Sequence, residues 1–153
     1  MADTSAYHNI ERWVRDFELP KRFKQPFEKK RLPIGTKSNG TPATHEFDAV
    51  SGDGKIVVSV KASSGKTTGG KGPSGKIKDS YAEVFFLSRL QKRDKRFLVL
   101  TDREYYELFK KDSDGKIPEG VEMMNIEPPE HLAEEVHKAR KKASEEVSPR
   151  RPQ

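Results

Sequence analysis

Two alternating runs separated by a tight turn dominate the pattern of hydrophobic and polar positions along the chain. Residues 45–50 alternate in a way that predicts Phe47 and Ala49 on one face, and Ile56, Val58 and Val60 occupy every second position of residues 56–62. A period of two predicts strands with one buried face. Residues 51–55 between the runs contain two glycines and an aspartate, which favour a tight turn. The sequence therefore predicts a β-hairpin over residues 45–62.

Further elements are predicted on both sides of this hairpin. Apolar residues with helical spacing predict a helix over residues 6–17, which should end at Leu19-Pro20. The other predicted elements, in chain order, are an edge strand at 32–35, a helix at 76–91, a buried strand at 97–100, a helix at 103–110 capped by Asp102, a strand at 121–126 and a helix from 130 to about 143. This order predicts an α/β (α+β) fold with a central mixed sheet flanked by helices. We expect one domain over residues 1–143 and a disordered tail over residues 144–153.

Composition narrows the class of partner. The chain has 153 residues, enough for one ordinary core, but 35% of them are charged and 32% hydrophobic, so part of the chain must be solvated. A net charge of +6 and a pI near 9.4 favour an anionic partner, with nucleic acid ahead of an acidic membrane. The absence of cysteine excludes disulfides and thiolate chemistry. No apolar run approaches about 18 residues, so we expect a cytoplasmic protein that does not enter the membrane.

Two basic segments are candidates for contact with a phosphate backbone. Residues 21–31 interleave cations with Phe23 and Phe27, and residues 63–76 are rich in glycine, serine, threonine and lysine. The candidate nucleic-acid-binding residues are Lys24, Lys29, Lys30, Arg31, Lys66, Lys71 and Lys76. For the first segment the alternative is a solvated connector whose two phenylalanines pack into the core. The second segment matches a phosphate-binding P-loop only in part, because Gly72 stands where that loop needs serine or threonine.

The polar face of the hairpin carries the candidate chemistry. Strict alternation places Glu46, Asp48, Ser59 and Lys61 on the face opposite the apolar one, and one register sets Asp48 opposite Ser59 and Glu46 opposite Lys61. A carboxylate that holds a divalent ion, beside a lysine that stabilises charge, is typical of a metal-dependent phosphodiesterase. The alternative is a cross-strand salt bridge, which contributes little when exposed. Glu11 on the first helix is expected to be an exposed glutamate.

This arrangement resembles the PD-(D/E)xK nuclease superfamily, which has the restriction endonuclease-like fold. Over residues 6–102, Asp48 matches the first aspartate of the family motif and Lys61 its lysine, whereas Ser59 stands where the family usually has aspartate or glutamate. One group of restriction endonucleases is similar in having a Ser-Val-Lys strand, with the second carboxylate on the following helix. The resemblance implies Asp48 and Glu83 as metal ligands, with Asp79 on the same helix and Glu46 as substitutes for Glu83.

Two hypotheses follow. The first is an endonuclease that uses Mg²⁺ or Mn²⁺ to hydrolyse DNA, with RNA as the alternative substrate; Asp48, Lys61 and Glu83 would be catalytic, and a homodimer would allow both strands to be cut. The second is a nuclease-like fold that has lost its chemistry and serves as a nucleic-acid-binding or assembly module. The feature that favours the second hypothesis is Ser59, because a metal-binding carboxylate is missing there.

Overall fold

The structure, a computed structural model, describes residues 5–62, 74–90, 95–135 and 138. Its elements are α1 (Ser5–Trp13), the π-helix η1 (Val14–Glu18), α2 (Leu19–Phe23), β1 (Phe27–Thr36), β2 (Pro42–Ser51), β3 (Ile56–Lys61), α3 (Ser74–Ser88), β4 (Lys95–Leu100), α4 (Arg103–Asp112) and β5 (Val121–Asn125), and residues 130–135 are also helical. None of the helices in these ranges is long and apolar enough to cross a membrane. The fold is α+β, as the order of predicted elements indicated.

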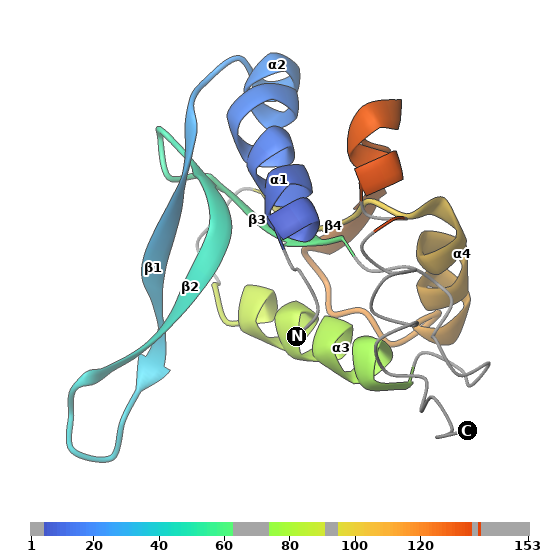
Figure 1. The fold of residues 1–153 in the computed structure, drawn as a ribbon. Helices are drawn as coiled ribbons and strands as arrows, with labels where there is room; N and C mark the ends of the chain where they lie inside the picture. The colour runs from blue at the N-terminus through green and yellow to red at the C-terminus, as the bar shows by residue number, and fades with distance from the viewer. Residues whose placement is uncertain (1–4, 63–73, 91–94, 136–137, 139–153) are drawn as a thin grey trace, which may run out of the picture.

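The five strands form one mixed sheet in the order β1-β2-β3-β4-β5. The first three strands are antiparallel neighbours, whereas β3, β4 and β5 run parallel to one another. The connection from β3 to β4 contains α3, as a connection between parallel neighbours requires. The predicted mixed sheet with flanking helices is therefore confirmed (Figure 1).

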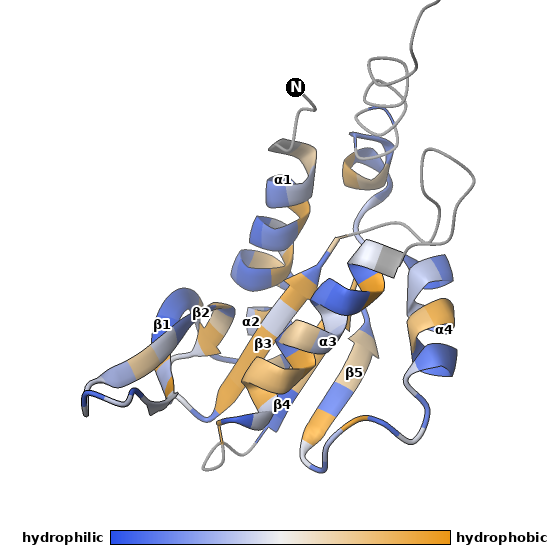
Figure 2. Cartoon of the chain, turned by 90° about the horizontal axis from the view of Figure 1, so that it is seen from below, coloured by the Kyte–Doolittle hydropathy of each residue, from blue (hydrophilic) through white to orange (hydrophobic). Residues whose placement is uncertain are grey.

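Helices cover both faces of this sheet. On one face the segment from α1 to α2 packs over Val58, Val60 and Val99, and on the other face α3 and α4 pack over Val57 and Leu98. The central strands β3 and β4 are accordingly mostly hydrophobic (Figure 2). The predicted apolar face of β3 is thus confirmed. The opposite face of β3 is equally buried, because α3 covers it.

The N-terminal helix continues past the point where the sequence predicted its end. A π-helical turn, η1, follows α1, and Pro20 then lies in the first turn of α2, a position that proline tolerates. The chain leaves the helix only at Lys24, which has a left-handed conformation with φ of 56°. Lys24 is therefore a helix cap as well as an exposed cation.

Strand β1 is longer than the short edge strand that the sequence predicted. It spans Phe27–Thr36 and includes the cations Lys29, Lys30 and Arg31, all of which are exposed. Phe27 is buried and Phe23 packs beside it, with ring centroids 5.9 Å apart. Phe23 and Phe27 both join the core, as the alternative interpretation of residues 21–31 expected, but the segment is helix and strand rather than a connector. Its contact with a phosphate backbone stays a prediction.

A β-bulge in β2 changes the predicted facing of its side chains. The register between β1 and β2 shifts between Glu28 and Lys30, so that Asp48 and Ala49 together lie opposite Lys29. Phe47 therefore packs with the α3 side of the sheet and Ala49 with the α1 side, and the prediction that they share a face is wrong. The predicted register between β2 and β3 is confirmed at Ala49–Val58. The prediction that Asp48 and Ser59 share a face is wrong, because Asp48 turns to the α1 side of the sheet and Ser59 lies under α3.

Candidate functional site

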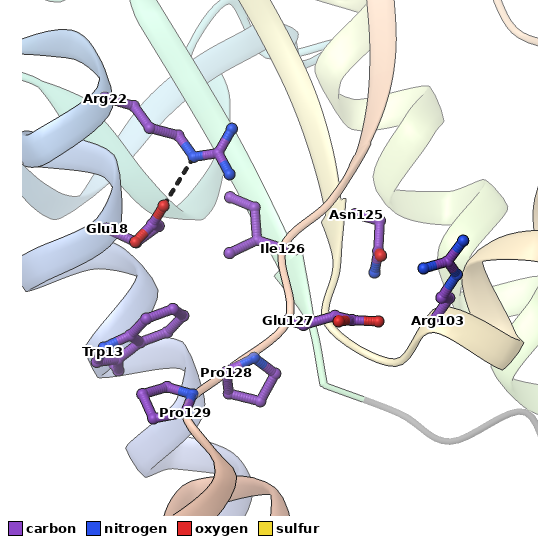
Figure 3. Close-up of a pocket in the computed structure, with 9 residues that line it drawn as sticks. All are labelled: Trp13, Glu18, Arg22, Arg103, Asn125, Ile126, Glu127, Pro128 and Pro129. Carbon is purple, nitrogen blue, oxygen red and sulfur yellow. Dashed lines mark hydrogen bonds and ion pairs between the residues drawn. The ribbon is translucent and has the colours of Figure 1, made fainter.

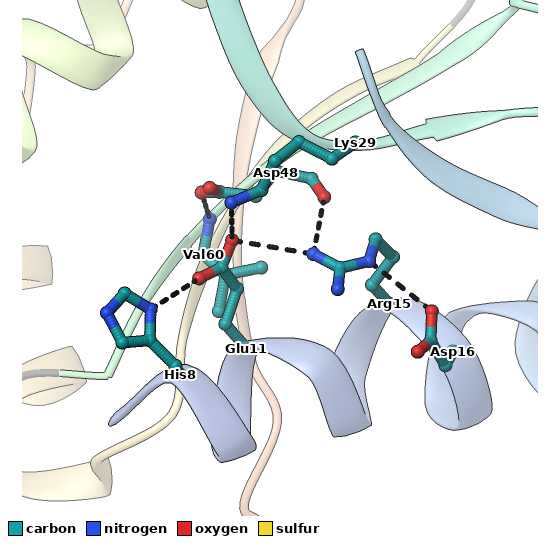
Figure 4. Close-up of polar contacts among 7 residues, drawn as sticks. All are labelled: His8, Glu11, Arg15, Asp16, Lys29, Asp48 and Val60. Atoms are coloured by element: carbon teal, nitrogen blue, oxygen red, sulfur yellow. Dashed lines mark hydrogen bonds and ion pairs between the residues drawn. The ribbon is translucent and has the colours of Figure 1, made fainter. Parts of the chain in front are cut away.

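Asp48 lies where the pairing between β2 and β3 ends. The pairs formed are Ala49–Val58 and Val50–Val57, and at the next position the Asp48 side chain replaces the backbone partner. The Val60 N–H donates a hydrogen bond of 2.7 Å to Asp48 Oδ2 (Figure 4). Arg15 Nη1, from η1, donates to the Asp48 carbonyl oxygen at 3.4 Å. The bulge and these two bonds hold the carboxyl group at the α1 side of the sheet.

Glu11 on α1 is the partner of Asp48 that sequence reasoning missed. Its carboxylate faces Asp48, and its Oε1 lies 3.1 Å from Lys29 Nζ and 3.5 Å from Arg15 Nη1. The side chain is only 15% exposed, so the prediction of an exposed glutamate is wrong. The sequence did hold one sign of this burial: Glu11 adjoins the buried stripe of the helix that Ile10 and Val14 form. Figure 4 shows Glu11 rising from α1 toward Asp48 and Lys29.

The electrostatics of this carboxylate pair are unusual. Burial, followed by the hydrogen bond with Glu11 and the negative charges of Glu11 and Glu83, raises the pKa of Asp48 to about 7 against the opposing effect of the Val60 amide. Burial alone would raise the pKa of Glu11, but its contacts with Asp48, Lys29 and Arg15 outweigh that effect and lower the pKa. On the acid side of about pH 7 the two groups therefore hold about one proton between them, and they lose it as the pH rises through about 7.

Glu83 reaches the same region from the opposite face of the sheet. Its Oε2 accepts a hydrogen bond from Ser59 Oγ at 2.9 Å and lies 3.2 Å from His45 Nε2. Ser59 is fully buried under α3. His45 is itself fixed, because its ring stacks on Phe86 with centroids 4.0 Å apart. Glu83 is thus anchored to β3 at Ser59.

The other candidate residues lie at varied distances from this pair. Lys61 ends β3, is partly buried and makes no side-chain hydrogen bond or ion pair with the described part of the chain. Glu46 is exposed and pairs across the strands with Arg31. Asp79 is exposed on α3. It acts on Tyr105, whose pKa is raised mainly by burial and further by the negative charge of Asp79. Lys76 lies in the first turns of α3, whereas Lys66 and Lys71 are outside the described residues.

The donor set suits a hard divalent cation. Carboxylate oxygens are the ligands that Mg²⁺ prefers, and Mg²⁺ is commonly held by one or two carboxylates, with water and substrate phosphate completing its coordination. Glu11 Oε1 is buried and lies between the side-chain nitrogens of Lys29 and Arg15, so a metal ion bound at this oxygen would take the place of one of these cations. Across the described ranges no group of three or more His, Cys, Asp or Glu side chains is positioned to hold a metal ion. The pair Asp48–Glu11 therefore fits a cation that substrate helps to bind.

A pocket of about 380 Å³ lies on the other flank of α1 (Figure 3). It is lined by Trp13, Glu18, Arg22, Arg103, Asn125, Ile126, Glu127, Pro128 and Pro129. Glu18 and Arg22 form an ion pair of 2.9 Å within it. The pocket shares no residue with the carboxylate pair, but Trp13 stands only two positions after Glu11 on the same helix.

Comparison of the chain with protein-family models, with curated proteins and with solved structures finds no match. The assignment of function therefore depends on the geometry of the site.

Proposed function

We propose that this chain is a metal-dependent endonuclease of the restriction endonuclease-like fold, which hydrolyses phosphodiester bonds of DNA. The order of elements supports the proposal: a helix, three antiparallel strands, a connecting helix and a parallel strand. The observation that carries it is the buried pair of carboxyl groups, Asp48 and Glu11, at the point where β2 and β3 part. Burying two acids side by side is costly unless a cation or proton offsets their charge.

In this proposal Asp48 and Glu11 hold Mg²⁺ or Mn²⁺. The bound ion would neutralise charge that develops on the phosphate and lower the pKa of a water molecule. The chain's own residues position these two ligands. The Val60 N–H fixes one oxygen of Asp48, while Lys29 and Arg15 hold the Glu11 carboxylate from two sides. Because the Lys29 side chain is 42% exposed, it can also contact a substrate phosphate.

Ser59 and Glu83 together take the place of the missing motif acid. The serine hydroxyl anchors a carboxylate that comes from α3, so a negative charge still acts on Asp48 from this side. Lys61, at the end of the same strand, would stabilise charge on the phosphate. Glu83 has a positioning and electrostatic role while it is hydrogen-bonded to Ser59 and His45, and it becomes a ligand only if it leaves them.

A catalytically inactive nucleic-acid-binding or assembly module is the second candidate. The observation that favours it is the double engagement of Glu83, whose Oε2 is bound by both Ser59 and His45. An oxygen that already binds two protein groups is poorly placed to complete a metal site. This module would bind nucleic acid in a salt-sensitive manner without cleaving it.

The test is cleavage of plasmid and single-stranded DNA with Mg²⁺ or Mn²⁺. We expect Asp48→Asn, Glu11→Gln and Lys61→Ala each to lose about 100-fold or more in rate, since replacing even the partners of metal ligands commonly costs up to that factor. The matched control is Glu104→Gln, which removes one exposed carboxylate from α4 and should leave the rate unchanged. No cleavage by the wild type, or cleavage that survives these site changes, would refute the nuclease and leave the binding module.

A further inference from the structure

The hairpin of β1 and β2 extends well beyond the rest of the sheet. The two strands pair from Phe27–Ser51 to Thr36–Pro42, whereas β2 pairs with β3 only at Ala49 and Val50. We call residues 30–47 the arm. From the pair Lys30–Phe47 to the pair Thr36–Pro42 the arm is about 20 Å long, at roughly 3.3 Å per residue. Figures 1 and 2 both show it projecting from one side of the molecule.

The base of the arm is packed firmly against the body of the protein. Leu32 and Phe47 are buried against the α3 side of the core, and the His45 ring stacks on Phe86. Arg89 Nε, at the end of α3, donates a hydrogen bond of 3.0 Å to the Ile34 carbonyl oxygen. These contacts fix the direction of the arm, so it is already oriented before a partner binds.

The outer half of the arm is exposed and polar. All residues from Thr36 to Pro42 are exposed, and the only large apolar side chains in the arm, Leu32, Ile34 and Phe47, belong to its packed base. A stable protein interface needs an apolar centre, which this surface lacks. The cations Lys30, Arg31 and Lys37 outnumber the single carboxylate, Glu46. An anionic partner therefore fits the arm better than a second copy of the chain does.

The exposed groups are those that contact nucleic acid. Arg31 is exposed, and its Nη1 donates to Thr44 Oγ1 at 3.2 Å. At the turn, Asn39 Oδ1 accepts from Thr41 Oγ1 at 2.7 Å, and Lys37 stands beside them. Guanidinium, ammonium, amide and hydroxyl groups supply most contacts to phosphates and base edges.

We infer that the arm enters the major groove of duplex DNA. Two paired strands lie about 4.8 Å apart, so a β-ribbon with its side chains fits a groove about 12 Å wide and about 8.5 Å deep. The corresponding groove of A-form RNA is too narrow for side chains to read, so the shape selects DNA over RNA. The inference rests on the proposed function for its nucleic-acid partner, and it narrows the substrate of that function to double-stranded DNA.

The position of the arm relative to the carboxylate pair supports this substrate. The residue just before the arm, Lys29, lies opposite the bulge that carries Asp48, and its Nζ is 3.1 Å from Glu11. A duplex held by the arm would therefore have one strand of its backbone beside Asp48 and Glu11. The arm would hold the duplex while the carboxylate pair acts on one strand.

The experiment measures binding with a chelator present, so that cleavage does not contribute. Fluorescence anisotropy is recorded over a range of salt concentrations with a DNA duplex of about two helical turns, the RNA duplex of the same sequence and the single DNA strand. The arm variant is Arg31→Ala with Lys37→Ala. The matched control, Lys111→Ala with Lys116→Ala, removes the same charge from exposed positions at the end of α4. Lys37→Glu alone, at the exposed turn, is a second arm variant that touches no core residue.

We expect the wild type to bind the DNA duplex at least tenfold more tightly than the RNA duplex, and the arm variant to lose roughly tenfold or more for the DNA duplex. The slope of log K against log salt should fall by about two in the arm variant and stay the same in the control. Equal binding of the two duplexes, or an equal loss in the control, would overturn the inference. Self-association of the wild type that both arm variants abolish would overturn it in favour of a second copy.

Cleavage is read separately with Mg²⁺ and distinguishes this inference from the proposed function. A wild type that cuts nothing but binds duplex DNA through the arm would refute the nuclease and support the arm. A wild type that cuts DNA while both arm variants bind the duplex as tightly as it does would support the nuclease and refute the arm.

Discussion

The raised pKa of Asp48 should make the protein less stable as the pH rises. The carboxyl has a pKa of about 7 in the folded chain and an ordinary value of 3.8. Between these values the folded state keeps a proton that the unfolded state has lost, so the free energy of unfolding falls with pH. At about 1.4 kcal/mol per unit, a shift of about three units amounts to at most about 4 kcal/mol.

Glu11 acts in the opposite direction, and its effect reduces the net loss. Its pKa is lowered in the folded state, so it contributes stability above its ordinary pKa, and that stability is lost as the pH falls. Because the two groups share about one proton, we expect a net loss on the order of 2 kcal/mol between about pH 4 and about pH 8. Asp48→Asn removes the titrating group but keeps an oxygen that can accept from Val60 N–H, so its stability should fall much less over this range.

Urea unfolding, followed by the fluorescence of the single tryptophan, Trp13, measures this difference. Glu104→Gln serves as the control and should follow the wild type. At the alkaline end, Mg²⁺ at about 100 times its dissociation constant should stabilise the wild type by about 2.7 kcal/mol and leave Asp48→Asn unchanged. Parallel pH profiles for the wild type and Asp48→Asn would refute the assignment of a buried, protonated Asp48.

Three further changes test the packing around the site. Ser59→Ala leaves Glu83 without its buried donor and should cost about 1–3 kcal/mol by urea unfolding; a neutral result would show that Glu83 is not anchored there. Phe47→Ala removes a fully buried ring at the base of the arm and should cost about 3–5 kcal/mol, seen as a lower thermal midpoint, whereas a small change would contradict the packing. Asp102→Ala removes the cap of α4, in which Asp102 Oδ2 accepts from Tyr105 N–H at 2.8 Å, and should cost about 1 kcal/mol, with Asp102→Asn close to the wild type; equal loss in both would argue against the cap.

Local patterns in the sequence were sufficient for much of the fold. The hairpin of β2 and β3, its register and the Asp102 cap all follow from side-chain period and turn chemistry, which act over a few residues. The bulge at Asp48 and Ala49 could not be predicted from side-chain alternation, because alternation assumes that neither strand contains an extra residue. The full length of β1 was not predicted, because its run of cations is unlike a buried strand. Such a run is compatible with β1 because this strand forms the edge of the sheet.

Part of the candidate site could also be predicted from local patterns in the sequence. Asp48 and Lys61 are conspicuous because they stand on a strongly patterned hairpin. Glu11 depends on a contact between segments 37 residues apart, and a helix residue beside an apolar stripe is as often exposed as buried. Only the packing of α1 against β2 and β3 decides that Glu11 turns inward.

The bulge also determines which changes in chain length the protein can tolerate during evolution. Deleting Ala49 would remove the bulge opposite Lys29, and the side chains on one side of the deletion would exchange faces. Such a variant would retain every acidic and basic residue discussed above and yet separate Asp48 from Glu11. Insertions in the exposed turn at residues 37–41 would leave that pair untouched. Among any relatives, the spacing within β2 should therefore be more constant than the length of the arm.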